Sequence, residues 1–102
     1  MKIKTDNSAD ETRLIVEGDI DLYSSPELRD AVLAAVPKST TGVGVHLESV
    51  GYMDSSGVAT LVEGLRSAKE NDKSFVLVAP SHAVMKVLEL ARLDSVFEVR
   101  PA

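Results

Sequence analysis

Cysteine is absent from this chain of 102 residues, so disulfides, thiolate zinc sites, iron–sulfur ligation and cysteine nucleophiles are all excluded. Aromatic residues are few, and the four that occur are Tyr23, Tyr52, Phe75 and Phe97. None stands beside a basic stripe, so the bases of a nucleic acid would have no stacking platform. The 11 Lys and Arg residues are scattered and outnumbered by 16 Asp and Glu, which gives a net charge of −5. Because nucleic acids bind clustered cations, we expect neither DNA nor RNA as a partner.

Long apolar runs are also missing, and none approaches the ~20 residues that a membrane-spanning helix needs. Residues 1–6 lack the apolar core of a signal peptide. We therefore expect a cytoplasmic protein with no direct membrane insertion. The composition, 44% hydrophobic and 26% charged, is typical of a globular protein, and the length suits one domain spanning residues 1–102. We expect this domain to be a monomer when free.

The sequence contains little that is typical of an enzyme. Its two histidines, His46 and His82, occur without a nucleophile-elbow pattern of the form Gly-x-Ser-x-Gly. No glycine-rich loop is followed by Lys-Ser or Lys-Thr, and histidines and acidic residues do not recur at metal-ligand spacing. We therefore expect a protein that is not an enzyme, with no catalytic residues, no cofactor and no metal site.

Apolar periodicity and turn residues divide the chain into alternating strands and helices. Apolar or β-branched runs predict strands at residues 2–4, 13–17, 43–47, 75–79 and 96–99. Residues 24–27 combine a serine cap, a proline and an early glutamate, which indicates a helix running to about Pro37. Two further apolar stripes predict helices from the 53–57 turn to about Asp72, and from Ser81 to about Asp94. The order β-β-α-β-α-β-α-β predicts an α/β domain, with crossover helices on a mixed sheet of four or five strands.

The segment Met53-Asp54-Ser55-Ser56-Gly57 leads from a strand into a helix and brings two hydroxyls to the helix N-terminus. The first N–H groups of a helix lack intrahelical partners and carry partial positive charge, so a phosphate there would be stabilised. A plainer role exists, because Ser and Asp are also the usual N-cap residues. Gly57 provides either a close backbone approach or only a permissive helix entry. The residues alone leave both pairs of alternatives open.

Several segments in sequence resemble those of one family, the bacterial anti-sigma factor antagonists (anti-anti-sigma factors), which have the STAS domain fold. The segments are residues 17–23 (EGDIDLY), 25–29 (SPELR), 53–57 (MDSSG) and 87–94 (VLELARLD), followed by Val96-Phe97. The resemblance extends over nearly the whole chain. It implies a single STAS domain at residues 1–102.

The resemblance implies a phosphorylation-controlled partner switch in transcription regulation. The unphosphorylated antagonist would bind an anti-sigma factor that is also a serine kinase, and this binding would release the sigma factor. Phosphorylation by the kinase would end the binding, and a PP2C-type phosphatase would restore it. The hydroxyl that is phosphorylated in the family maps to Ser56, with Ser55 as second choice. The partner-binding residues implied are Asp21, Asp54, Ser55, Ser56, Gly57 and Val58.

A phosphoserine adds roughly −1.5 to −2 charges at neutral pH. The resemblance places Asp21 on the same surface as Asp54, so the phosphate would enter an interface that already carries two carboxylates. Repulsion and the cost of desolvation would then weaken binding, while the helix N-terminus would let the fold itself tolerate the charge.

A second interpretation makes the domain a cytoplasmic STAS regulatory subunit of a transporter, for instance a lipid-trafficking ABC system, where it would bind the ATPase. The Ser55-Ser56 pair favours the antagonist, because a transporter subunit needs no kinase-accessible serine. The chain also departs from the family pattern: His46 stands where an aspartate is frequent, and Val58-Ala59 where Leu-Gly is frequent. His46 either tunes local charge between about pH 5 and 8 or is a strand histidine held by a hydrogen bond.

Overall fold

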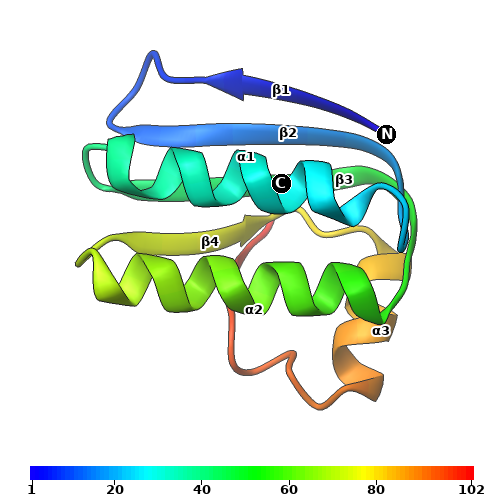
Figure 1. Cartoon of the computed structure of the whole chain (residues 1–102). Helices are drawn as coiled ribbons and strands as arrows, with labels where there is room; N and C mark the ends of the chain where they lie inside the picture. The colour runs from blue at the N-terminus through cyan, green and yellow to red at the C-terminus, as the bar shows by residue number, and fades with distance from the viewer.

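The computed structural model describes residues 1–102, which form five strands and three helices (Figure 1). In chain order they are β1 (Lys2–Asp6), β2 (Glu11–Ile20), α1 (Ser25–Lys38), β3 (Gly42–Met53), α2 (Ser55–Glu70), β4 (Ser74–Val78), α3 (His82–Leu90) and β5 (Glu98–Arg100). This order confirms the predicted succession of an α/β domain. None of the three helices is both long and apolar enough to traverse a bilayer.

The strands form one mixed sheet in the order β1-β2-β3-β4-β5. β1 runs antiparallel to β2, and every other neighbouring pair is parallel. Parallel neighbours require crossover connections, which α1, α2 and α3 supply in turn. Leu14 pairs with Val45, and Val45 pairs with Leu77, so an apolar row crosses the centre of the sheet. The prediction of a mixed sheet with crossover helices is confirmed, with five strands.

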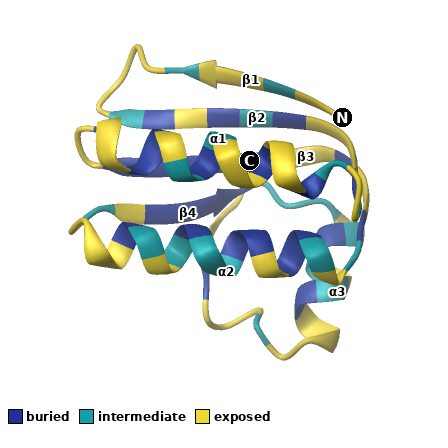
Figure 2. Ribbon diagram, viewed as in Figure 1, coloured by how far each residue is buried: buried dark blue, intermediate teal, exposed yellow.

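Helices α1 and α2 lie side by side over one face of the sheet (Figure 1), and their dark blue buried stripes are marked in Figure 2. Val32 of α1 and Leu61 of α2 are completely buried, and burying one such side chain contributes about 1.5–3 kcal/mol. Gly64 allows the close approach of these layers. A Cβ at this position would lie 2.6 Å from Phe75 Cζ and 2.6 Å from Val32 Cγ1. The close packing fixes where α2 begins relative to the sheet.

The two central strands are longer than predicted. β2 continues past residue 17 to Ile20, and β3 continues past residue 47 to Met53. Their pairing shifts register on both sides of Glu17, next to Gly18 with its φ of +99°, and this irregularity breaks the alternation that sequence patterns rely on. Because the pairing ends with Ile20 opposite Met53, the loops that follow β2 and β3 emerge together at one edge of the sheet.

The last helix is shorter than predicted, since α3 ends at Leu90 instead of near Asp94. Arg92 has a φ of +60°, and the Leu93 N–H donates to the Leu88 carbonyl at 2.8 Å, which closes the helix as in a Schellman motif. Ala91 is consequently exposed and does not join the buried stripe. The final strand is correspondingly displaced, to Glu98–Arg100 instead of residues 96–99.

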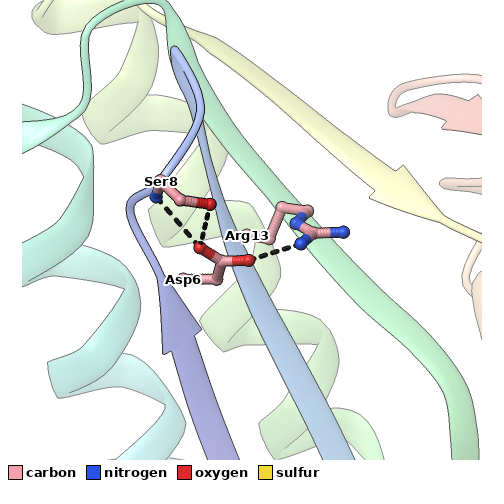
Figure 3. Close-up of polar contacts among 3 residues, drawn as sticks. All are labelled: Asp6, Ser8 and Arg13. Atoms are coloured by element: carbon pink, nitrogen blue, oxygen red, sulfur yellow. Dashed lines mark hydrogen bonds and ion pairs between the residues drawn. The ribbon is translucent and has the colours of Figure 1, made fainter.

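The hairpin between β1 and β2 is held by the carboxylate of Asp6. This group accepts hydrogen bonds from the Ser8 N–H at 2.9 Å and the Ser8 Oγ at 2.6 Å, and it forms an ion pair with Arg13 (Figure 3). The hydrogen bonds from Ser8, and then the guanidinium of Arg13, hold the pKa of Asp6 well below its ordinary range. The two strands predicted at residues 2–4 and 13–17 thus pair with each other as an antiparallel hairpin.

A charged cluster surrounds His46 in β3. The carboxylate of Glu11 lies against Gly44, and Arg100 of β5 reaches it with two hydrogen bonds of 3.0 and 2.9 Å. The Nε2 atom of His46 is buried without a hydrogen-bond partner, so the expectation of a hydrogen-bonded strand histidine is wrong for this nitrogen. Burial, followed by the positive charge of Arg13, lowers the pKa of His46 from its ordinary value of 6.5.

His46 should therefore make stability depend on pH in a mildly acidic window. A lowered pKa means that the unfolded chain binds the proton more readily, so the free energy of unfolding falls as the pH drops through 6.5 toward the folded-state pKa. The lowered pKa of Glu11 acts only below its ordinary value of 4.5. Urea unfolding at about pH 7 and about pH 5 should show this loss in the wild type and little of it in His46→Gln. Equal losses in both proteins would contradict the assignment.

Candidate functional site at the start of helix α2

Asp54 is the residue that starts α2. It stands in extended conformation after β3, with φ −108° and ψ −171°, and its Oδ1 accepts a hydrogen bond from the Ser56 N–H at 2.9 Å. Its carbonyl accepts from the N–H groups of Gly57 at 3.1 Å and Val58 at 3.3 Å. Asp54 is therefore the N-cap of the helix, which is the plainer of the two roles that the sequence left open for this segment. Capping leaves both serine hydroxyls uncommitted to the backbone.

The two serines of the motif differ in their surroundings. Ser55 is exposed in the first turn of α2, and Ser56, the next residue, is half-buried. The Ser56 Oγ donates to Asp54 Oδ1 at 2.5 Å, so a single carboxylate oxygen holds both the amide and the hydroxyl of Ser56. The hydrogen bond from the Ser56 side chain is the main cause of the lowered pKa of Asp54. The Ser56 hydroxyl is thus oriented by an ionised carboxylate.

Gly57 and Val58, both predicted to bind a partner, face inward. Val58 is only 8% exposed. A Cβ on Gly57 would lie 2.5 Å from Met53 Cγ and 2.8 Å from Ile20 Cγ2, so this glycine serves close backbone approach to the ends of β2 and β3. Neither residue offers an exposed side chain. A part for these two residues in partner binding stays a prediction. Because both are buried, they would act by fixing the position of α2 and not by touching the partner.

The loop between β2 and α1 is folded around Asp21. Its Oδ1 accepts hydrogen bonds from the N–H groups of Tyr23 and Ser24, both at 3.0 Å, which makes an Asx-type turn. The Ser24 Oγ lies 2.9 Å from the Asp19 carbonyl and accepts from the Asp21 N–H at 2.9 Å. Hydrogen bonds from Ser24 are the first cause of the lowered pKa of Asp21. The turn is therefore held in one shape by its own polar groups.

The β2–α1 loop and the start of α2 form one surface. The Asp54 N–H donates to the Ile20 carbonyl at 3.1 Å, and the Leu22 backbone contributes to lowering the pKa of Asp54. The negative charge of Asp54 in turn opposes the lowering of the pKa of Asp21, which reflects their proximity. The three ion pairs of the protein join Asp6, Glu11 and Glu63 to arginines. Asp21 and Asp54 therefore present negative charge without a paired cation.

Three apolar side chains near this surface are exposed, and two of them, Leu22 and Tyr23, were not assigned to it from the sequence. Tyr23 is 91% exposed, Leu22 is 68% exposed, and Tyr52, whose neighbours Met53 and Val58 are buried, is 51% exposed. A signal existed for the first two, because Leu22 and Tyr23 stand in a polar turn outside every apolar stripe.

No group of three or more His, Asp or Glu side chains is arranged to hold a metal ion.

Comparison with known proteins identifies the family to which this chain is similar. A family profile described as "Mlab, STAS domain" matches residues 3–100. An anti-sigma-B factor antagonist from Staphylococcus aureus is 31% identical over 84 residues, which covers 82% of this chain and 78% of that protein.

Solved structures share the fold. An anti-sigma factor antagonist from Mycobacterium paratuberculosis superposes with a TM-score of 0.87 at 24% identity, covering 99% of this chain and 86% of that one. The anti-sigma factor antagonist SpoIIAA in its unphosphorylated form superposes with a TM-score of 0.82 at 21% identity, and the Bacillus cell fate determinant SpoIIAA in its phosphorylated form with 0.77 at 20%. The two SpoIIAA comparisons each cover 99% of this chain, and 88% and 91% of the respective SpoIIAA chains. The chain therefore belongs to the STAS domain family, and the relatives described here are named anti-sigma factor antagonists.

Proposed function

We propose that the protein is a cytoplasmic anti-sigma factor antagonist that works as a phosphorylation-controlled partner switch. Unphosphorylated, it binds an anti-sigma factor with serine kinase activity. Transfer of a phosphoryl group to Ser56 ends this binding, and a PP2C-type phosphatase restores it. The observation that carries the proposal is the Ser56 hydroxyl, which Asp54 Oδ1 holds at 2.5 Å at the start of α2. The relatives named anti-sigma-B factor antagonist, and SpoIIAA with its phosphorylated form, support the same reading.

The geometry suits a switch because it separates folding from binding. A phosphate on Ser56 lies beside the partially positive N-terminus of α2, where the helix dipole stabilises negative charge. The same phosphate lies beside Asp54 and on the same surface as Asp21, both ionised at neutral pH because their pKa values are lowered. A partner that covers this surface must desolvate a dianion as well as two carboxylates. The fold is therefore expected to keep its stability while the interface loses affinity.

Ser56 is preferred over Ser55 because only its hydroxyl is oriented. Incubation with a cognate serine-kinase anti-sigma factor and ATP is expected to add one phosphate to the wild type, mapped to Ser56 by mass spectrometry. Ser56→Ala should accept none, and Ser55→Ala, the matched control one residue away, should still be modified. Phosphate on Ser55 in the wild type would overturn the choice of residue. Failure of every kinase of the source genome to modify or bind the wild type would overturn the proposed function.

The alternative function, a regulatory STAS subunit of a transporter, predicts that charge at residue 56 has no effect on partner binding. It requires that the domain bind a transporter ATPase stably, with an affinity that does not depend on the charge at residue 56. Pull-down of purified candidate ATPases with the wild type and with Ser56→Glu distinguishes the two functions. Equal capture of an ATPase by both proteins, together with no phosphorylation by any kinase, would establish the alternative.

A further inference from the structure

The turn between β2 and α1 displays two apolar side chains to solvent. Tyr23, at 91%, is the most exposed large apolar residue in the protein, and Leu22 is 68% exposed. Most apolar side chains of this size are buried in a monomeric domain, and exposed clusters mark contact surfaces. Leu90, at the C-terminal end of α3, is comparably exposed at 77%, but it belongs to a different region of the fold.

These side chains stand on a pre-organised turn. The Tyr23 and Ser24 N–H groups both donate to the Asp21 carboxylate, and the Ser25 N–H donates to the Asp21 carbonyl at 2.8 Å. Ordering a loop at an interface costs conformational entropy, and a turn already held in shape avoids most of that cost. Tyrosine is also among the residue types most enriched at the energetic centres of interfaces. The turn therefore presents an apolar tip that is ready to dock.

Negative charge without a paired cation surrounds this tip. Asp19, Asp21 and Asp54 take part in none of the three ion pairs of the protein. Asp54 is held beside this loop, because its N–H donates to the Ile20 carbonyl, two residues before Leu22, at 3.1 Å. The complementary surface is an apolar pocket rimmed by Arg or Lys, since an arginine can pair with a carboxylate and also stack on a tyrosine ring.

We propose that Leu22 and Tyr23 form the anchor of the partner interface, inserting into an apolar pocket of the anti-sigma kinase that is flanked by basic side chains. This inference rests on the proposed function and adds residues that contact the partner. The β2–α1 loop, which carries the anchor, and Ser56, in the first turn of α2, both contact Asp54, so a phosphate on Ser56 would lie at the edge of the docked tip. Phosphorylation would then prevent the anchor from inserting into the pocket, because a dianion would have to be desolvated beside it.

The test measures binding of the unphosphorylated chain to each serine-kinase anti-sigma factor of the source genome by titration calorimetry. Tyr23→Ala and Leu22→Ala are expected to weaken binding roughly tenfold or more each, as for central interface residues, whereas Tyr23→Phe should retain affinity within about threefold. Leu90→Ala is the matched control, equally exposed on α3, and should change nothing. Thermal unfolding of all four variants should match the wild type, because the replaced side chains lie outside the core.

The outcomes separate the two claims. If a kinase binds the wild type, and binds Tyr23→Ala and Leu22→Ala equally well, the anchor is overturned and the proposed function stands. If Leu90→Ala weakens binding as much as Tyr23→Ala, the contact is not specific to the tip and the anchor is again overturned. If no kinase binds the wild type, the proposed function fails and the anchor fails with it.

Discussion

Gly57→Val is expected to destabilise the domain by about 1–3 kcal/mol and to displace the start of α2 from the sheet. The glycine packs where no side chain fits, because a Cβ would lie 2.5 Å from Met53 Cγ and 2.9 Å from Met53 Sδ. Ile20 closes the other side at 2.8 Å. Met53 and Ile20 are both buried at the ends of paired strands, so neither can move without opening the core.

The matched control is Ala59→Val, which adds a β-branched side chain at an exposed position two residues further along α2. It should cost below ~1 kcal/mol, the difference in helix propensity. Urea unfolding measures both variants. Phosphorylation by the kinase should slow in Gly57→Val under native conditions, because the helix start that carries Ser56 has moved, and it should be normal in Ala59→Val. Similar stability of the two variants would show that Gly57 is only a permissive helix entry.

The sequence allowed the order of elements to be predicted because the apolar stripes are regular. The stripes of α1 and α2 and the continuous run of β4 lie where the pattern indicated. The ends of β2 and β3 were not predicted. Residues 17–19 of β2 are exposed, as are most of residues 48–52 of β3, so both segments have the polar sequence that is typical of a loop. The end of α3 was missed because Arg92 adopts a left-handed φ that no sequence pattern announces for arginine.

The site could be predicted in part. Asp54 as a helix cap follows from a preference that holds for most helices, and the structure confirms it. The hydrogen bond from Ser56 Oγ to the same carboxylate depends on a side-chain rotamer, which residue types do not specify. The exposure of Tyr23 depends on the turn that Asp21 builds, and the missing hydrogen bond of His46 depends on neighbours from other strands. These are tertiary properties that local patterns do not encode.

Phosphorylation of Ser56 is expected to weaken binding to the kinase by at least ~100-fold, which corresponds to about 2.7 kcal/mol. Three negative groups would then share one covered surface, because Asp21 and Asp54 are both near and both ionised at neutral pH. The charges are screened while the surface is exposed to water, so the cost appears when a partner covers them. The same phosphate should leave the stability of the free domain within about 1 kcal/mol, since the N-terminus of α2 accommodates it.

The most direct test is a calorimetric titration of the kinase with the unphosphorylated chain and with the chain fully phosphorylated on Ser56, followed by treatment of the second sample with a PP2C-type phosphatase. The proposed switch predicts tight binding of the first sample, loss of at least ~100-fold in affinity for the second, and full recovery after the phosphatase. Equal affinity of the phosphorylated and unphosphorylated chains would contradict it.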